Sequence, residues 1–213
     1  MRLTRHTLGQ FAVAGALLLS SGCSILPQAE PSDVYRLSTA QPAAASQGTP
    51  VAWSLRIVRP RASEMLDSPR IAVVPQGDVI SNYKGARWTD PAPVALRNRL
   101  LDAFYRDGRL TSLSTDDSNL QADFELSGEL QSFQSEYHGT AIDVVIRLDA
   151  RLANDRQRIV ASHRFEVHQA VADKQVGSVV AGFNKAADTL SAQVLQWTVE
   201  QGQQHYATLP KNQ

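Results

Sequence analysis

The clearest pattern in the chain is the alternation of core-type and polar residues between positions 124 and 167. A period of two is typical of strands with one face in the core and the other in water. The core positions of three successive strands are Phe124, Leu126, Gly128 and Leu130, then Ile142, Val144, Ile146, Leu148, Ala150 and Leu152, then Ile159, Ala161, His163, Phe165 and Val167. Because only short polar turns separate these strands, the pattern predicts an antiparallel meander, with charged residues able to pair across its outer face.

Shorter apolar stretches before the meander predict further strands. They lie at 34–37, 53–58, 70–74, 79–83 and 110–113. The residues between 74 and 79 include Pro75, Gly77 and Asp78, which favour a turn between two of these strands.

Two segments instead repeat apolar residues in steps of three and four, which is typical of amphipathic helices. The first spans 91–107, with Asp90 as the expected N-cap and Gly108 as the left-handed residue that ends it. Its predicted buried stripe is Leu96, Leu100, Ala103 and Phe104, and its predicted outer residues include Arg97 and Arg99. The second begins near Ser178, and its buried positions are Val179, Phe183, Ala186, Leu190, Val194 and Trp197. We expect the polar residues after Gln201 to fray.

These elements predict a single α/β domain, in which a mixed β-sheet with a C-terminal antiparallel meander is packed by two main α-helices. We expect the domain to span 34–201 and a polar tail to span 202–213.

The N-terminus predicts export and lipid attachment. Arg2 and Arg5 precede an apolar run at 11–19 and three small residues at 20–22, after which comes Cys23, the only cysteine among the 213 residues. This arrangement resembles the lipobox of bacterial lipoproteins. The resemblance implies that 1–22 is a signal peptide, that Cys23 carries acyl chains such as palmitate, and that 23–33 is a lipidated tether. Ser24 favours the outer membrane by the same resemblance. The alternatives are an ordinary secretory signal with a chance cysteine, or a buried free cysteine.

Composition and motifs argue against several function classes. The chain has 21 basic and 21 acidic residues, so it lacks the basic excess of a general nucleic-acid binder. His163 and His168 lie an odd number of residues apart on one strand, so they face opposite sides and cannot share a metal. Gly177 and Gly182 have the spacing of a P-loop, but Phe183 and Asn184 replace its lysine and hydroxyl residue. We therefore expect no catalytic site, no metal and no cofactor.

The segment 81–88 is the best candidate for contact with a partner. It combines Tyr83 and Trp88 with Lys84 and Arg87, and these residue types are common at binding hot spots. The alternative is that the two aromatic residues pin a loop onto the core while the cations face water. Both descriptions can hold together.

Several residues, in their order along the chain, resemble the ABC-type transport auxiliary lipoprotein family, which includes the lipoprotein of the Pqi intermembrane transport system. They are the lipobox, Tyr35 and Leu37, the run 68–71, Tyr83 followed by Arg87, Trp88 and Pro91, and the run 123–126 leading to Phe133.

The resemblance implies a non-catalytic outer-membrane lipoprotein that faces the periplasm. It would work beside an ABC ATPase, a permease and an MCE-domain protein that together move lipids or other hydrophobic molecules between membranes. It would dock the MCE assembly at the outer membrane, with several copies gathering there if it forms a homo-oligomer. A periplasmic lipid carrier and a scaffolding lipoprotein for another outer-membrane assembly are the alternatives.

Overall fold

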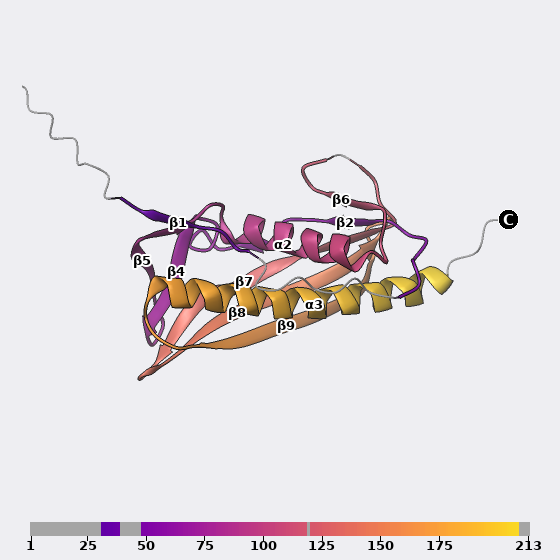
Figure 1. Cartoon of the computed structure of the whole chain (residues 1–213). Coiled ribbons are helices and arrows are strands. Elements are labelled where there is room, and N and C mark those ends of the chain that lie inside the picture. Colours follow the sequence, from indigo (N-terminus) through magenta and orange to yellow (C-terminus); the bar gives the residue numbers. More distant parts are fainter. Residues whose placement is uncertain (1–30, 39–47, 119, 209–213) are drawn as a thin grey trace, which may run out of the picture. The chain divides into compact units, whose positions relative to one another are not determined.

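The computed structural model describes residues 31–38, 48–118 and 120–208, and it confirms the α/β fold (Figure 1). The described elements lie in one compact unit that begins at Ser32. They are β1 (Asp33–Tyr35), β2 (Leu55–Ile57), β3 (Arg61–Ala62), β4 (Arg70–Gln76), β5 (Val79–Trp88), α2 (Ala92–Asp107), β6 (Leu113–Thr115), β7 (Phe124–His138), β8 (Ala141–Asn154), β9 (Ile159–Val171) and α3 (Val176–Thr208). Among the described residues, the strands form one mixed sheet of nine.

Strand β7 organises this sheet because both of its edges are paired. One edge pairs antiparallel with β8 along its length, and β8 pairs antiparallel with β9, which confirms the predicted meander. The other edge pairs in parallel with β2, then β3, then β4. The sheet continues from β4 through β5 to β1, and from β2 to β6. The two ends of β7 therefore carry different neighbours.

The two helices pack on the core side of the sheet. Helix α3 packs against β7, β8 and β9, and α2 packs against α3 and β2. An aromatic cluster joins the layers, since the ring of Phe183 on α3 lies 4.8 Å from Phe133 on β7 and 5.2 Å from Trp88 on β5. The predicted positions Leu96, Leu100 and Phe104 of α2 are buried as expected, although Ala103 is only partly so.

The prediction that Arg97 and Arg99 lie outside the α2 interface is wrong, because each side chain is only 6% exposed. Arg97 forms ion pairs with Asp116 and Asp117, at 2.7 and 2.8 Å, in the segment after β6. A buried guanidinium requires such partners, and they come from parts of the chain that a helical wheel does not include.

Arg99 also has an acidic partner on the other helix. It pairs with Asp102 one turn later, at 3.2 Å, and with Asp188 on α3. The second pair links α2 to α3 in the interior.

The start of α2 also differs from the prediction. The N-cap is Pro91 rather than Asp90, and no side chain caps the helix. Its end is confirmed, since Gly108 adopts a φ of 75° and its N–H bonds to the carbonyl of Phe104.

The prediction that the chain frays after Gln201 is wrong, because α3 continues to Thr208. Gly202 is buried against the ring of Trp53, and the indole N–H of Trp53 donates to the Gln203 side chain at 3.4 Å. The helix end is polar in composition, so the sequence pattern did not indicate that the small residue Gly202 lets the helix approach Trp53. The remaining predicted tail residues, 209–213, lie outside the described residues.

The start of β9 contains one further correction. Ile159 was expected in the core but is 59% exposed. Leu152 pairs with Ala161, whereas Ala153 pairs with Ile159, so one extra residue is inserted in β9 between the two pairs. This bulge turns Ile159 to the outer face.

Candidate functional site

The predicted partner segment lies on an irregular part of β5. Strand β4 pairs with β5 at Arg70 with Arg87 and at Ala72 with Asn82, so only Ile71 stands opposite the four residues 83–86. Gly85 in this bulge has a φ of 69°, a conformation that favours glycine. The sequence predicted a strand only over 79–83, and the structural alternative for 81–88 was a loop, but β5 continues to Trp88 as a bulged strand. Bulges commonly redirect side chains.

Tyr83 and Trp88 face the interior, as the structural alternative expected. The hydroxyl of Tyr83 shares hydrogen bonds of 2.9 Å with the hydroxyls of Ser135 and Tyr137 on β7. Burial raises the pKa of Tyr83 above its ordinary value. Trp88 is fully buried in the aromatic cluster with Phe133 and Phe183. The two aromatic side chains therefore fix β5 to the core.

Lys84 and Arg87 have the opposite exposure, since both lie at the surface. Arg87 stands between the exposed residues Val34 on β1 and Arg70 on β4. Arg70, Lys84 and Arg87 are three exposed cations on β4 and β5. Because these three residues place positive charge on one part of the surface, this surface is suited to an acidic partner.

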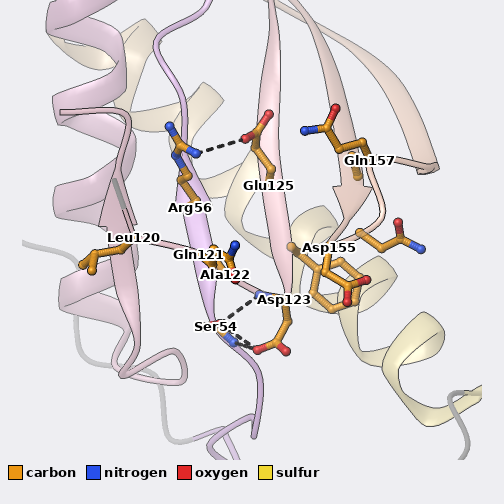
Figure 2. Close-up of a pocket in the computed structure, with 12 residues that line it drawn as sticks. Ser54, Arg56, Leu120, Gln121, Ala122, Asp123, Glu125, Asp155 and Gln157 are labelled. Atoms are coloured by element: carbon orange, nitrogen blue, oxygen red, sulfur yellow. Dashed lines mark hydrogen bonds and ion pairs between the residues drawn. The ribbon is translucent and has the colours of Figure 1, made fainter. Parts of the chain in front are cut away.

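A polar hollow lies at the other end of β7, where β2 and β7 begin and β8 turns into β9. Its volume is about 700 Å³, and its lining includes Arg56, Asp123, Glu125, Asp155 and Gln157 (Figure 2). Nothing in the sequence pattern predicted it, because it depends on the parallel register that places Arg56 beside Glu125.

Two interactions hold the wall of this hollow together. The backbone N–H and the hydroxyl of Ser54 donate to the Asp123 carboxylate at 2.7 and 2.6 Å, and the N–H of Asp123 donates back to the Ser54 hydroxyl at 2.9 Å. Arg56 and Glu125 form an ion pair at 3.8 Å (Figure 2). These contacts join β2 to the start of β7, so they have a structural role.

The outer face of the meander carries the cross-strand charge pairs that the alternation predicted. Arg164 bonds to Asp149 at 2.5 and 2.8 Å, and Arg147 bonds to Glu166 at 2.8 and 2.7 Å. Hydrogen bonds from Arg147 and His168 lower the pKa of Glu166 to about 2, and Arg164 likewise holds the pKa of Asp149 below its usual value. Carboxylates held ionised in this way are poor proton donors at neutral pH.

The described residues include no group of three or more histidines, cysteines, aspartates or glutamates placed to hold a metal ion. Within the same residues, no helix is both long and apolar enough to span a membrane. The predicted signal peptide 1–22 and the predicted lipidation site Cys23 lie outside the described residues.

Comparison with known proteins gives consistent matches. The family model described as ABC-type transport auxiliary lipoprotein component matches residues 35–195. An uncharacterized protein from Bradyrhizobium diazoefficiens is 30% identical over 147 residues, which are 68% of this chain and 39% of that protein. The chain therefore spans well under half the length of this curated relative.

Two solved structures share the fold. A crystal structure of a protein from Xanthomonas campestris, assigned to DUF330, matches with a TM-score of 0.77 and 28% identity, covering 83% of this chain and 100% of that one. A crystal structure of an uncharacterized protein matches with a TM-score of 0.61 and 15% identity, covering 78% of this chain and 98% of that one.

Proposed function

This chain belongs to the family of ABC-type transport auxiliary lipoprotein components, as its sequence resemblance indicated, and we propose that it docks the transporter's periplasmic assembly at the outer membrane. Membership makes it an auxiliary lipoprotein of an ABC-type transport system. The proposal adds the membrane, the partner and the contact surface.

The proposed anchor is Cys23, acylated and inserted in the periplasmic leaflet of the outer membrane. Nine residues separate Cys23 from Asp33, the first residue of β1, and the ten steps from one to the other extend at most about 3.5 Å each, or about 35 Å in total. A tether of this length keeps the folded body close to the membrane.

The proposed partner is the MCE-domain protein of the transporter, and the proposed contact surface is centred on Lys84 and Arg87. The observation that carries this choice is that β5 places its aromatic side chains in the core and its cationic side chains at the surface. Tyr83 and Trp88 are fixed to the core, while Lys84 and Arg87 are held at the surface by the same strand. A homo-oligomer would multiply this contact through avidity.

We propose a non-catalytic role because carboxylates on the outer face of the meander are engaged in ion pairs within the sheet. Glu129, for example, pairs with Arg61 at 2.8 Å and with Arg151 at 3.3 Å, and these bonds lower its pKa. The lining of the large hollow is polar and charged, which suits an acyl chain poorly. A lipid carrier is therefore the weaker alternative.

The test is a crosslinking pull-down of the acylated protein from intact envelopes, with partners identified by mass spectrometry. The wild type should capture an MCE-domain protein, and the double variant Lys84→Ala, Arg87→Ala should lose about tenfold in capture if the two cations together contribute about 1.4 kcal/mol. The control is Arg156→Ala, Arg158→Ala, which removes the same charge from the exposed turn between β8 and β9.

Two results would count against the proposal. If the wild type captures no MCE-domain protein, the assignment of the partner is wrong. If both double variants lose capture equally, the effect is one of net charge, and the β5 surface is not the contact.

A further inference from the structure

The turn between β4 and β5 exposes apolar side chains where a hairpin usually carries polar ones. All residues from 75 to 81, which we call the hairpin tip, are exposed. Among them, Val79 is 62% exposed and Ile80 is 37% exposed, and Pro75 adds a third apolar side chain. Exposed apolar groups at a hairpin turn are available for contact with another apolar phase.

The hairpin tip itself is poor in charge. Strand β4 runs parallel to β7, with Val74 opposite Glu136, so the turn after β4 and the turn after β7 lie at the same end of the sheet (Figure 1). The hairpin tip contains one charged residue, Asp78, and the turn between β7 and β8 contains only Gly139 and Thr140. The tip can therefore enter an apolar or zwitterionic surface without removing many charges from water, whereas the turn between β9 and α3 at the same end carries the opposite charges of Asp173 and Lys174.

The N-terminal end of β1 is directed toward the same end of the sheet. Strand β1 is parallel to β5, with Asp33 opposite Ala86, and β5 is antiparallel to β4. The direction from Tyr35 back to Asp33 is therefore the direction in which β4 runs from Arg70 toward Gln76. That stretch of β4 covers about 20 Å at about 3.3 Å per residue, which is less than the reach of about 35 Å between Cys23 and Asp33.

We propose that the hairpin tip inserts Val79 and Ile80 into the headgroup region of the bilayer that holds the acylated N-terminus. This inference rests on the proposed acylation of Cys23, because two apolar side chains bind weakly unless an anchor keeps them near the membrane. Together, the anchor and the hairpin tip give two contacts with one surface. They orient the body so that the polar hollow at the other end of β7 faces away from the membrane.

The test places an environment-sensitive fluorophore on single cysteines in the full-length acylated protein. Val79→Cys and Ile80→Cys report the hairpin tip. Ile159→Cys is the matched control, because Ile159 is 59% exposed and lies at the other end of the sheet. The proteins are reconstituted in vesicles of phosphatidylethanolamine and phosphatidylglycerol, with and without a lipid that carries a quencher near its headgroup.

The inference predicts a blue-shifted emission at positions 79 and 80 and roughly a twofold or greater loss of intensity with the quencher, since interfacial groups lie about 5–10 Å within the boundary. The label at position 159 should show neither effect. Equal quenching at all three positions, or no quenching at 79 and 80, overturns the inference. A tip label that is blue-shifted but not quenched by lipid also overturns it, because a protein then covers the tip.

The chain without an added cysteine separates this inference from the proposed anchor. If its Cys23 takes up the fluorophore, the thiol is free, and both the anchor and the inference fail. If Cys23 is blocked by acyl chains and the tip labels stay in water, only the inference fails.

Discussion

The substitution Gly202→Ala tests how the last turns of α3 pack. A Cβ at this position would lie 2.5 Å from Cζ2 and 2.7 Å from Cη2 of Trp53. Trp53 has little room to retreat, because it is 2% exposed and its ring lies 5.1 Å from that of Phe124. The new methyl group therefore forces either the helix or the indole ring to move.

The expected free energy combines two opposing effects. Replacing glycine by alanine inside a helix gains about 1 kcal/mol, whereas overpacking a filled core costs about 1–3 kcal/mol. We expect a net loss of up to about 2 kcal/mol in the free energy of unfolding. For a domain of this size, that lowers Tm by about 2–4 °C for each kcal/mol.

Gly177→Ala is the matched control, because Gly177 belongs to the same helix and a Cβ there meets nothing within 4 Å. It should leave stability unchanged or raise it by up to about 1 kcal/mol. Urea unfolding followed by circular dichroism measures both variants, and an unchanged m-value keeps the comparison valid. If Gly202→Ala is as stable as Gly177→Ala, the end of α3 does not pack on Trp53 and our account of this region is refuted.

Two further predictions concern charge. Asp188→Ala should lower the free energy of unfolding by roughly 2–4 kcal/mol, because it removes a partner of the buried Arg99. Asp117→Ala removes a side chain that is 71% exposed, so it should lower this free energy by under about 1 kcal/mol. Urea unfolding measures both variants, and equal losses would contradict the prediction. The pKa of Glu166 in the folded protein is about 2, below its ordinary value of 4.5, so its stabilising contribution is present above pH 4.5 and is lost as pH falls toward 2. Carboxyl NMR titration should show this pKa, and Arg147→Gln should raise it; a wild-type value near 4.5 would contradict the prediction.

Much of the fold could be predicted because it depends on local periodicity. The alternation in β7 and β8 placed Phe124, Leu126 and Leu148 on the core face, and all three are buried. The helices were likewise predicted from apolar spacing, and Gly108 correctly indicated the end of α2. Residue types alone also raised the possibility that Tyr83 and Trp88 are structural while Lys84 and Arg87 are exposed.

The errors arose where a bulge or a distant partner overrides the local pattern. One inserted residue in β9 reverses the face of Ile159. In β5, the strand continues through a longer bulge to Trp88, beyond the predicted strand at 79–83. No local signal indicates that Arg99 finds Asp188, which lies 89 residues later. The polar hollow was missed for the same reason, since its walls come from β2, β7 and the turn between β8 and β9.

The type of each main element, the class of the fold and the family could be read from the amino-acid sequence, because periodicity and motif order are properties of neighbouring residues. The folded structure is needed to show which charges are buried, where α3 ends, and that the N-terminal end of β1 is directed toward the end of the sheet that carries the apolar hairpin tip. These features depend on strand register and on contacts between distant residues. The physical reason is that burial and pairing energies are set by the partners that folding brings together, and a linear pattern does not specify those partners.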